Sequence, residues 1–461
     1  MQEYDSVLKA ARGLAEPSDK EQKQLTEIAN YVLKRVEKVC MSKNLPLKPL
    51  LAGSFAKGTW IAGDADIDIF VKVPTLLAKE ELGKLGIEIG KSALRGHAPY
   101  LRYSEHPYVE AWVRGVRINV VVCYDVPKGD WMSAADRSPY HTELIKERFD
   151  NAMRGEAKLL KRFLKGLGIY GAEIKTKGFS GYVTEVLILK FGTFLDTLRS
   201  ISMTKFGNSI VQSDLDKPFA QLHDTPMVIL DPVDPRRNLG AAISKQRVAE
   251  FILGASLFLA RPSMKYFEFS SFVPLLKKAI LSNVAVVLFR HKERTVDKLW
   301  GQLNKSMSHV EKHLIDQNFR VLRSIAASDD KRESAFVFLF EGIELPDMKV
   351  RAGPETSFSS DSVKFVEANK NRSDILFVGA DGRINSLEKR GIRNVKDGLG
   401  FLLDKGIETS GISTGLQDEL RKTKRVMIGT EISKFAQKRN WLKEAVAEVA
   451  TTSKIVDRTS Q

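Results

Sequence analysis

The sequence predicts an α+β protein that is built from several domains. Its 461 residues suffice for about three domains of ordinary size. The N-terminal part mixes helical and alternating strand patterns, a mainly helical stretch follows, and strand and helix patterns then alternate again. We therefore expect a first domain over residues 1–148, a helical domain over 149–261 and a C-terminal region over 262–461.

Composition points to a polyanionic partner. The formal net charge is +15, which favours binding to nucleic acid or to an anionic membrane. No run of about 20 apolar residues predicts a membrane span, and the charged first residues do not resemble a secretion signal. Cys40 and Cys123 are too few for a disulfide framework or a zinc site. We expect a nucleic-acid partner and a cytoplasmic location.

In the first domain, residues 21–40 have the periodicity of an amphipathic helix. The segment IDIFVKV then predicts a strand, and YVEAWV and VRINVVVCY predict two more strands that turn at Gly115. In the second domain, residues 143–170 and 180–200 have helical periodicity. One apolar helix stripe consists of Leu159, Leu160, Phe163 and Leu164.

The C-terminal region has a different pattern. AVVLFRH and SAFVFLFEGIEL predict strands, residues 294–326 predict one or two helices, and ILFVGADGRINSLEKR predicts a hairpin that turns at Asp381-Gly382. This order is typical of α+β sandwiches in RNA-binding modules. Residues 417–449 predict a basic helical tail, which is either a solvated helix face or an RNA contact. Its basic cluster comprises Arg421, Lys422, Lys424 and Arg425.

The segment GSFAKGTWIAGDADIDIFV, residues 53–71, carries the strongest chemical signal. Asp64, Asp66 and Asp68 alternate with apolar residues, so on a strand they share one face, ~6.6 Å apart. Such carboxylates repel one another unless cations neutralise them. Magnesium prefers oxygen ligands and bridges to phosphates, and two such ions stabilise an in-line displacement at phosphorus.

The turn before these carboxylates can bind an anion. Gly53 permits a close approach of the backbone, Ser54 supplies a hydroxyl group, and Lys57 lies one turn further on. A glycine–serine pair alone is more often a plain surface turn. Its combination with a basic residue and with paired carboxylates that open an apolar strand favours a nucleotide site.

This combination resembles the polymerase-beta nucleotidyltransferase superfamily. Further blocks resemble the class I, archaeal-type CCA-adding enzymes, and they occur in the order of that family: EHPYVEAWVRGVRINVVVCYDV, SAADRSPYH, LLKRFLKGLGIYG, KGFSGYVTEVLILKFGTF, DPVDPRRNLGAAIS and ELPDMKVRAGP. The resemblance implies a polymerase-beta-like catalytic domain, a helical central domain, and an α+β RNA-binding C-terminal domain with a helical tail. It also implies template-independent addition of C, C and A to the tRNA 3′ end from CTP and ATP, with release of pyrophosphate.

The resemblance also assigns partners and residues. The tRNA acceptor arm and 3′ end, ATP and CTP are the expected partners, Mg²⁺, as two ions, is the expected cofactor, and a homodimer is expected. Asp66 and Asp68 match the metal-binding carboxylates of the family, which leaves Asp64 outside the ligand set. Arg237 matches an arginine that presents the base edge, with Arg236 as the alternative. The other nucleotide-binding matches are Ser54, Lys57, His141, Lys161 and Tyr170.

One position departs from the family pattern. The third catalytic, metal-binding carboxylate falls on Asn119, whose amide oxygen can bind magnesium but cannot accept a proton from a 3′-hydroxyl. Loss of a general base costs about 10²–10⁴ in rate. Either Asn119 still binds the metal, or Glu110 compensates from the neighbouring strand. Glu110 would lie opposite Asn119 if the strands turn symmetrically over Arg114-Gly115.

Two other functions stay open at this point. A related nucleotidyltransferase of the poly(A) type would share the catalytic motif but not the later blocks. A tRNA-binding protein with weakened or lost catalysis would explain both Asn119 and the positive charge.

Overall fold

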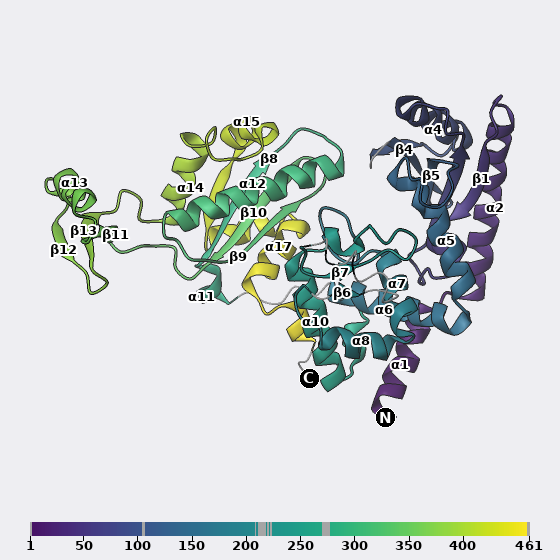
Figure 1. The fold of residues 1–461 in the computed structure, drawn as a ribbon, viewed down its shortest axis with the longest axis horizontal. Helices are drawn as coiled ribbons and strands as arrows, with labels where there is room; N and C mark the ends of the chain where they lie inside the picture. Colours follow the sequence, from purple (N-terminus) through teal and green to yellow (C-terminus); the bar gives the residue numbers. More distant parts are fainter. Residues whose placement is uncertain are drawn as a thin grey trace. The chain divides into compact units, whose positions relative to one another are not determined.

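The computed structural model describes residues 2–103, 107–207, 209–210, 218, 221, 224–269 and 277–458. The chain forms two compact units (Figure 1). Unit 1 comprises Met1–Ser271 and Ser453–Gln461, and unit 2 comprises Phe272–Thr452. In the described part of the chain, no helix combines the length and the apolar composition that a membrane crossing needs.

Unit 1 contains a five-stranded sheet with the order β1-β2-β5-β4-β3. Its strands are β1 Lys48–Ala52, β2 Asp66–Val73, β3 Tyr100–Tyr103, β4 Pro107–Val113 and β5 Val116–Tyr124. β2 and β5 are parallel, and the other neighbours are antiparallel. The three strands that the sequence predicted here are confirmed.

Alternation along the strands gives this sheet two different faces. Apolar residues such as Ile69 and Val120 are fully buried on one face, against helices α2 Asp19–Met41 and α4 Lys79–Ala93. The alternate positions of β2 and β5 carry Asp66, Asp68 and Asn119 on the other face. The sheet therefore presents its polar residues together, on the face away from α2 and α4.

The β4–β5 hairpin turns symmetrically, as the alternative with Glu110 required. Val113 pairs with Val116, and Glu110 pairs with Asn119. Both turn residues have positive φ, 51° at Arg114 and 81° at Gly115, which matches a tight two-residue hairpin turn. Glu110 and Asn119 consequently share a face of the sheet.

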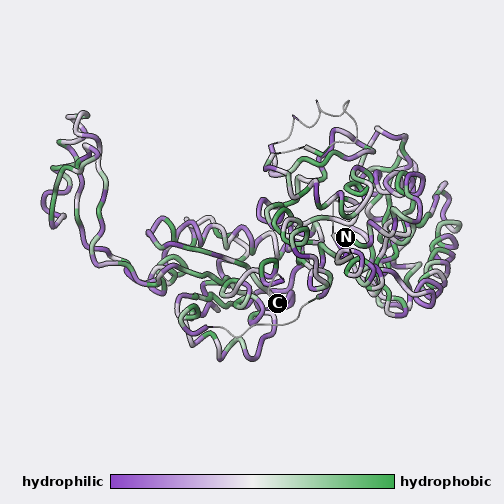
Figure 2. The backbone as a smooth tube through the Cα atoms, turned by 90° about the horizontal axis from the view of Figure 1, so that it is seen from below, coloured by the Kyte–Doolittle hydropathy of each residue, from purple (hydrophilic) through white to green (hydrophobic). Residues whose placement is uncertain are grey.

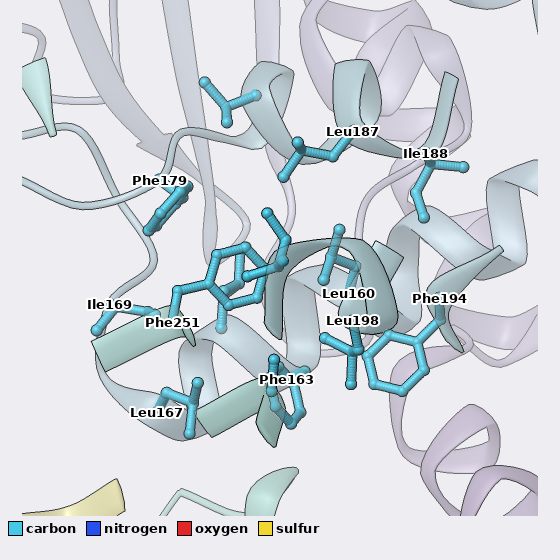
Figure 3. Packing of buried hydrophobic residues seen from close by; sticks show 14 of the residues in the cluster. Leu160, Phe163, Leu167, Ile169, Phe179, Leu187, Ile188, Phe194, Leu198 and Phe251 are labelled. Atoms are coloured by element: carbon cyan, nitrogen blue, oxygen red, sulfur yellow. The ribbon is translucent and has the colours of Figure 1, made fainter. Parts of the chain in front are cut away.

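The rest of unit 1 is mainly helical. Its core contains the predicted apolar stripe of Leu159, Leu160, Phe163 and Leu164, all fully buried. Figure 3 shows Leu160 and Phe163 in this core. The helices are α1 Gln2–Ala15, α3 Gly53–Lys57, α5 Arg137–Arg148, α6 Asn151–Leu167, α7 Gly181–Phe191, α8 Phe194–Ser202, α10 Lys245–Ala260 and α18 Lys454–Asp457. Short elements are β6 Ser209–Ile210, β7 Val228–Ile229 and the 3-10 turns Ala134–Asp136, Leu239–Ala242 and Met264–Tyr266.

Unit 2 is built on a four-stranded antiparallel sheet with the order β14-β8-β10-β9. Alternate residues of each strand enter two cores, so that Val287 and Phe336 belong to one and Val286 and Val337 to the other. The central strands β8 and β10 are therefore buried along almost their whole length, whereas hydrophobic and hydrophilic stretches are interspersed along the rest of the backbone (Figure 2). The elements are β8 Val284–Arg290, β9 Val321–Ser328, β10 Glu333–Phe340, β14 Arg425–Ile428, α11 Lys278–Leu281, α12 Val296–Asp316, α14 Val395–Asp404, α15 Thr414–Thr423, α16 Glu431–Ala436 and α17 Asn440–Ala450.

A second, three-stranded sheet in unit 2 has the order β11-β13-β12. It comprises β11 Met348–Glu355, β12 Ile375–Val378 and β13 Arg383–Lys389, with helix α13 Ser359–Asn369 inserted between β11 and β12. The hairpin predicted at Asp381-Gly382 is confirmed as the β12–β13 pair.

Two predictions for unit 2 are wrong in part. Residues 321–326 belong to strand β9, so the predicted helical segment ends earlier, with α12 at Asp316. Residues 425–428 form strand β14 inside the segment that was predicted to be a helical tail. Both strands are stabilised by pairing, β9 with β10 and β14 with β8, and this long-range gain outweighs the local helical pattern.

Candidate active site

The Gly53-Ser54 turn lies directly against the carboxylates of β2. Gly53 has φ 69°, and a Cβ atom at this position would lie 2.0 Å from Oδ2 of Asp68. Only glycine therefore allows α3 to follow β1 at this distance. The spacing of the motif thus brings Ser54 and Lys57 close to Asp68.

A cavity of about 350 Å³ opens beside this turn in unit 1. Seven of the nine site residues predicted from the sequence line it: Ser54, Lys57, Asp68, Asn119, His141, Lys161 and Tyr170. Asp66 and Arg237 do not line it. Side chains that were not predicted complete the wall, namely Phe70, Tyr108, Val121, Ser138, Thr142, Tyr182 and Glu185.

The two carboxylates of β2 have different partners. Asp68 accepts a hydrogen bond of 2.8 Å from Nδ2 of Asn119, its neighbour on β5. Burial raises the pKa of Asp68, although the hydrogen bond from Asn119 opposes the shift. Asp66 instead forms a two-point ion pair with Arg117, with Nε of Arg117 2.7 Å from Oδ1. Cation ligation by Asp66 therefore competes with this ion pair.

The oxygen donors next to Asp68 fit a hard divalent cation. Oδ1 of Asn119 is buried and has no hydrogen-bond partner, so an acceptor oxygen beside Asp68 is left unused. Such an orphaned oxygen is costly unless a ligand contacts it. Over the described ranges no cluster of three or more histidine, cysteine, aspartate or glutamate residues could hold a metal ion. A cation held by Asp68 would therefore find the amide oxygen of Asn119 beside it as a further oxygen donor.

Glu185 on α7 links Lys57 and Lys161, the two lysines that were predicted to bind nucleotide. Its carboxylate accepts hydrogen bonds of 2.7 Å from Nζ of Lys57 and of 2.7 Å from Nζ of Lys161, and a third from the hydroxyl of Thr59. All three charged groups are almost fully buried. Burial acts to raise the pKa of Glu185, but the two lysines outweigh it and lower the pKa to about 2. The cluster holds both ammonium groups at the cavity wall.

Glu185→Gln should destabilise unit 1 by about 3–5 kcal/mol at neutral pH, because it leaves two buried ammonium groups without a counter-ion. The carboxylate has a lower pKa in the folded state than its ordinary value of 4.5. Its contribution is therefore complete above about pH 4.5 and is lost as the pH falls toward 2. Urea unfolding of both proteins between pH 7 and pH 3 should show a difference that shrinks below about pH 4.5. Exposed Glu147→Gln is the control, and an equal loss there would contradict the assignment.

Asp231 organises a second group of side chains at the cavity. Its carboxylate is 2.8 Å from Nε2 of His141, 3.1 Å from the hydroxyl of Tyr182 and 3.3 Å from Nη1 of Arg237. The rings of His141 and Tyr182 stack with centroids 3.8 Å apart. Burial lowers the pKa of His141, although Asp231 opposes the shift. A predicted nucleotide contact, His141, and a predicted base-reading residue, Arg237, thus share one anchor.

The side chain of Glu110 does not line this cavity. It is buried opposite Asn119, but its carboxylate accepts a hydrogen bond from the hydroxyl of Tyr100 and lies 3.4 Å from Nε of Arg102. The register on which this alternative depended is present, whereas the carboxylate is held by Tyr100 and Arg102 of β3.

Glu185 and Asp231 were not among the predicted site residues. Glu185 is the single acidic residue in the apolar segment GYVTEVLIL, and Asp231 opens the block that also contains Arg237. An acidic residue in an otherwise apolar helix has to be paired, so the sequence did contain a signal for Glu185.

Comparison with known proteins gives three consecutive family matches. Residues 33–149 match a nucleotidyltransferase domain, residues 155–268 match the second domain of tRNA nucleotidyltransferase, and residues 282–429 match the C-terminal domain of CCA-adding enzyme. The CCA-adding enzyme of Sulfurisphaera tokodaii is 36% identical over 377 residues, which are 81% of this chain and 86% of that enzyme. The CCA-adding enzyme of Haloarcula marismortui is 30% identical over 455 residues, or 94% of this chain and 96% of that enzyme. The chain therefore belongs to the family of the CCA-adding enzymes, nucleotidyltransferases that act on tRNA.

Proposed function

We propose that the cavity of unit 1 is the site at which this chain adds C, C and A to the 3′ end of tRNA. CTP and ATP are the substrates, pyrophosphate is released, and no nucleic-acid template takes part. The observation that carries the proposal is the convergence of seven predicted residues on one cavity, although they lie between positions 54 and 170. Oxygen donors, ammonium groups and aromatic rings thereby line one cavity, which supports a shared nucleotide site.

Asp66, Asp68 and Asn119 would hold the metal, which we propose to be two Mg²⁺ ions. When bound, such ions stabilise the attacking and leaving oxygens of an in-line displacement at phosphorus. Asp68 and the unused Oδ1 of Asn119 are the donors that face the cavity. Asn119 cannot take the proton of the attacking 3′-hydroxyl, so this chain relies on charge stabilisation and on positioning at that step.

Ser54, Lys57 and Lys161 would bind the triphosphate. The two lysines are fixed by Glu185, so their ammonium groups need no reorganisation when the nucleotide enters. The phosphate oxygens would share these ammonium groups with the carboxylate of Glu185. Tyr170, which lies in the same wall, would contact the nucleotide next to them.

Arg237 and His141 would read the base. Cytosine and adenine must be distinguished by protein hydrogen bonds, and a guanidinium group presents five donors in a fixed fork. Arg237 and His141 both contact the carboxylate of Asp231, which favours Arg237 over the neighbouring Arg236. Tyr182, stacked on His141, would complete this part of the site.

The three consecutive family matches support a separate site for the body of the tRNA. We propose a catalytic domain over 1–148, a base-recognition domain over 149–261 and a tRNA-binding region over 262–461, and the three family matches follow this order. The tRNA acceptor arm is the proposed partner of the last region. A reducing cytoplasm is the proposed location, since Cys40 and Cys123 are both unpaired and buried.

A homodimer is also proposed. Val350 and Ile375 are paired with the same residue of β13, Leu387, and keep 58% and 54% of their surface exposed. A second copy that covers this apolar patch would remove it from water. Light scattering should then give twice the chain mass of 51.6 kDa. The mass of a single chain at micromolar concentration would contradict the dimer.

The function is tested with tRNA that lacks its terminal CCA. With CTP alone the chain should add two C residues, and with CTP and ATP it should complete CCA and stop. Sequencing of the product ends gives the result, and tRNA that already ends in CCA is the control. A homopolymeric A tail would favour the poly(A) type, and binding of tRNA without addition would favour a protein that lacks catalysis.

A further inference from the structure

Arg117 forms an ion pair with Asp66, which is one of the carboxylates proposed to bind the metal. The two residues are direct neighbours on the parallel strands β2 and β5, one position before the Ile67–Ile118 pair and two before Asp68 and Asn119. Both carboxylate oxygens of Asp66 accept hydrogen bonds from the guanidinium group. The contact is therefore a two-point pair on the polar face of the sheet, and it leaves no oxygen of Asp66 without a hydrogen bond.

The Arg117–Asp66 pair also lowers the negative charge that is available to attract a cation. Asp66 and Asp68 contribute two negative charges, Arg117 contributes one positive charge, and Asn119 contributes none, so the cluster carries a net charge of −1. The nearby carboxylate of Glu110 is already contacted by Arg102. A divalent cation is thus attracted far less than it would be by three free carboxylates.

The pair is nevertheless easy to open. The side chains of Arg117 and Asp66 are 39% and 36% exposed, and an ion pair of this exposure is worth at most about 1 kcal/mol. A buried pair such as the one between Glu185 and Lys161 would be far more costly to break. Asp66 is therefore a carboxylate that a ligand can free at small cost.

We propose that Arg117 is a counter-ion built into the metal site, which holds Asp66 until cation and nucleotide bind together. This inference rests on the proposed function of the cavity. Without a nucleotide, the cation meets one free carboxylate, one amide oxygen and a competing guanidinium group. A triphosphate supplies further oxygen ligands and negative charge, and these tip the competition for Asp66 toward the cation.

The test is a titration with Mn²⁺ followed by electron paramagnetic resonance, in the absence of tRNA. Arg117→Gln should bind Mn²⁺ about fivefold more tightly than the unchanged protein, which corresponds to the upper limit for such a pair. Arg117→Lys keeps the charge and should stay close to the unchanged protein. A CTP analogue that cannot transfer its nucleotide should raise the Mn²⁺ affinity of the unchanged protein more than that of Arg117→Gln. The two proteins should then differ less in Mn²⁺ affinity than they do without the analogue.

Arg114→Gln is the matched control. It removes one positive charge from the same hairpin, where Arg114 lies over the ring of Tyr31 instead of beside Asp66, and it should leave the Mn²⁺ affinity unchanged. Equal tightening in both variants, or none in Arg117→Gln, would overturn the inference. Asp68→Ala separates this result from the function itself. If Asp68→Ala binds Mn²⁺ as well as the unchanged protein, the cavity is not the metal site and the proposed function fails with it.

Discussion

Asp68→Ala is expected to lower the rate of nucleotide addition by about 10³-fold or more. The carboxylate lines the cavity between the Gly53-Ser54 turn and Asn119, where cation ligands are needed. Removal of a metal ligand forfeits several kcal/mol of transition-state stabilisation, and each ~1.4 kcal/mol is a factor of ten. Single-turnover addition of C to tRNA that lacks its terminus gives the rate.

Asp64→Ala is the matched control for that experiment. Asp64 comes from the same run of alternating carboxylates, but it is half exposed and pairs with Lys165 rather than facing the cavity. Its loss should change the rate only slightly. Both variants should bind tRNA as the unchanged chain does, because phosphate contacts are made by basic residues. Near-normal addition by Asp68→Ala would show that the metal assignment is wrong.

Asn119→Asp is expected to raise the rate of addition by about 10²-fold, within the range of about 10²–10⁴ for general-base catalysis. The new carboxylate would lie where Nδ2 of Asn119 now donates to Asp68 over 2.8 Å. Two carboxylates at this distance repel each other unless a cation lies between them. The gain should therefore appear at high magnesium concentration and disappear at low concentration.

Glu110→Gln separates the two explanations of Asn119. The carboxylate of Glu110 is held by Tyr100 and Arg102 and lies outside the cavity wall, so its replacement should alter the rate only a few-fold. If Glu110 has taken over as the base, Glu110→Gln should instead be as damaging as Asp68→Ala, and Asn119→Asp should give no gain. Measurement of both variants under the same single-turnover conditions decides between these outcomes.

The sequence predicted the parts of the site that depend on local spacing. Alternation placed Asp66 and Asp68 on one face of a strand, and the two-residue turn at Arg114-Gly115 gave the register that puts Glu110 opposite Asn119. What it could not give is pairing between distant residues. Arg117 meets Asp66 only because β2 and β5 are parallel neighbours in that register. Nothing near Asp66 in the chain indicates it.

Glu185 shows the same limit in the helical part of unit 1. Its two lysines come from α3 and α6, and it meets them only once those helices and α7 have packed. Strand β14 could not be predicted for the same reason. Its four residues lie between two helices and form a strand because they pair with β8. Local pattern picked out residues that line one cavity, and tertiary packing decided which charges neutralise one another.

This chain catalyses CCA addition, and we propose that an amide is one ligand of its metal site. The most direct test is the single-turnover rate of the first C addition by the unchanged protein, measured across a range of magnesium concentrations. We expect addition that is abolished by chelation and rises to a plateau with magnesium. An absence of C addition at every concentration, with tRNA still bound, would contradict the claim and identify a binding protein.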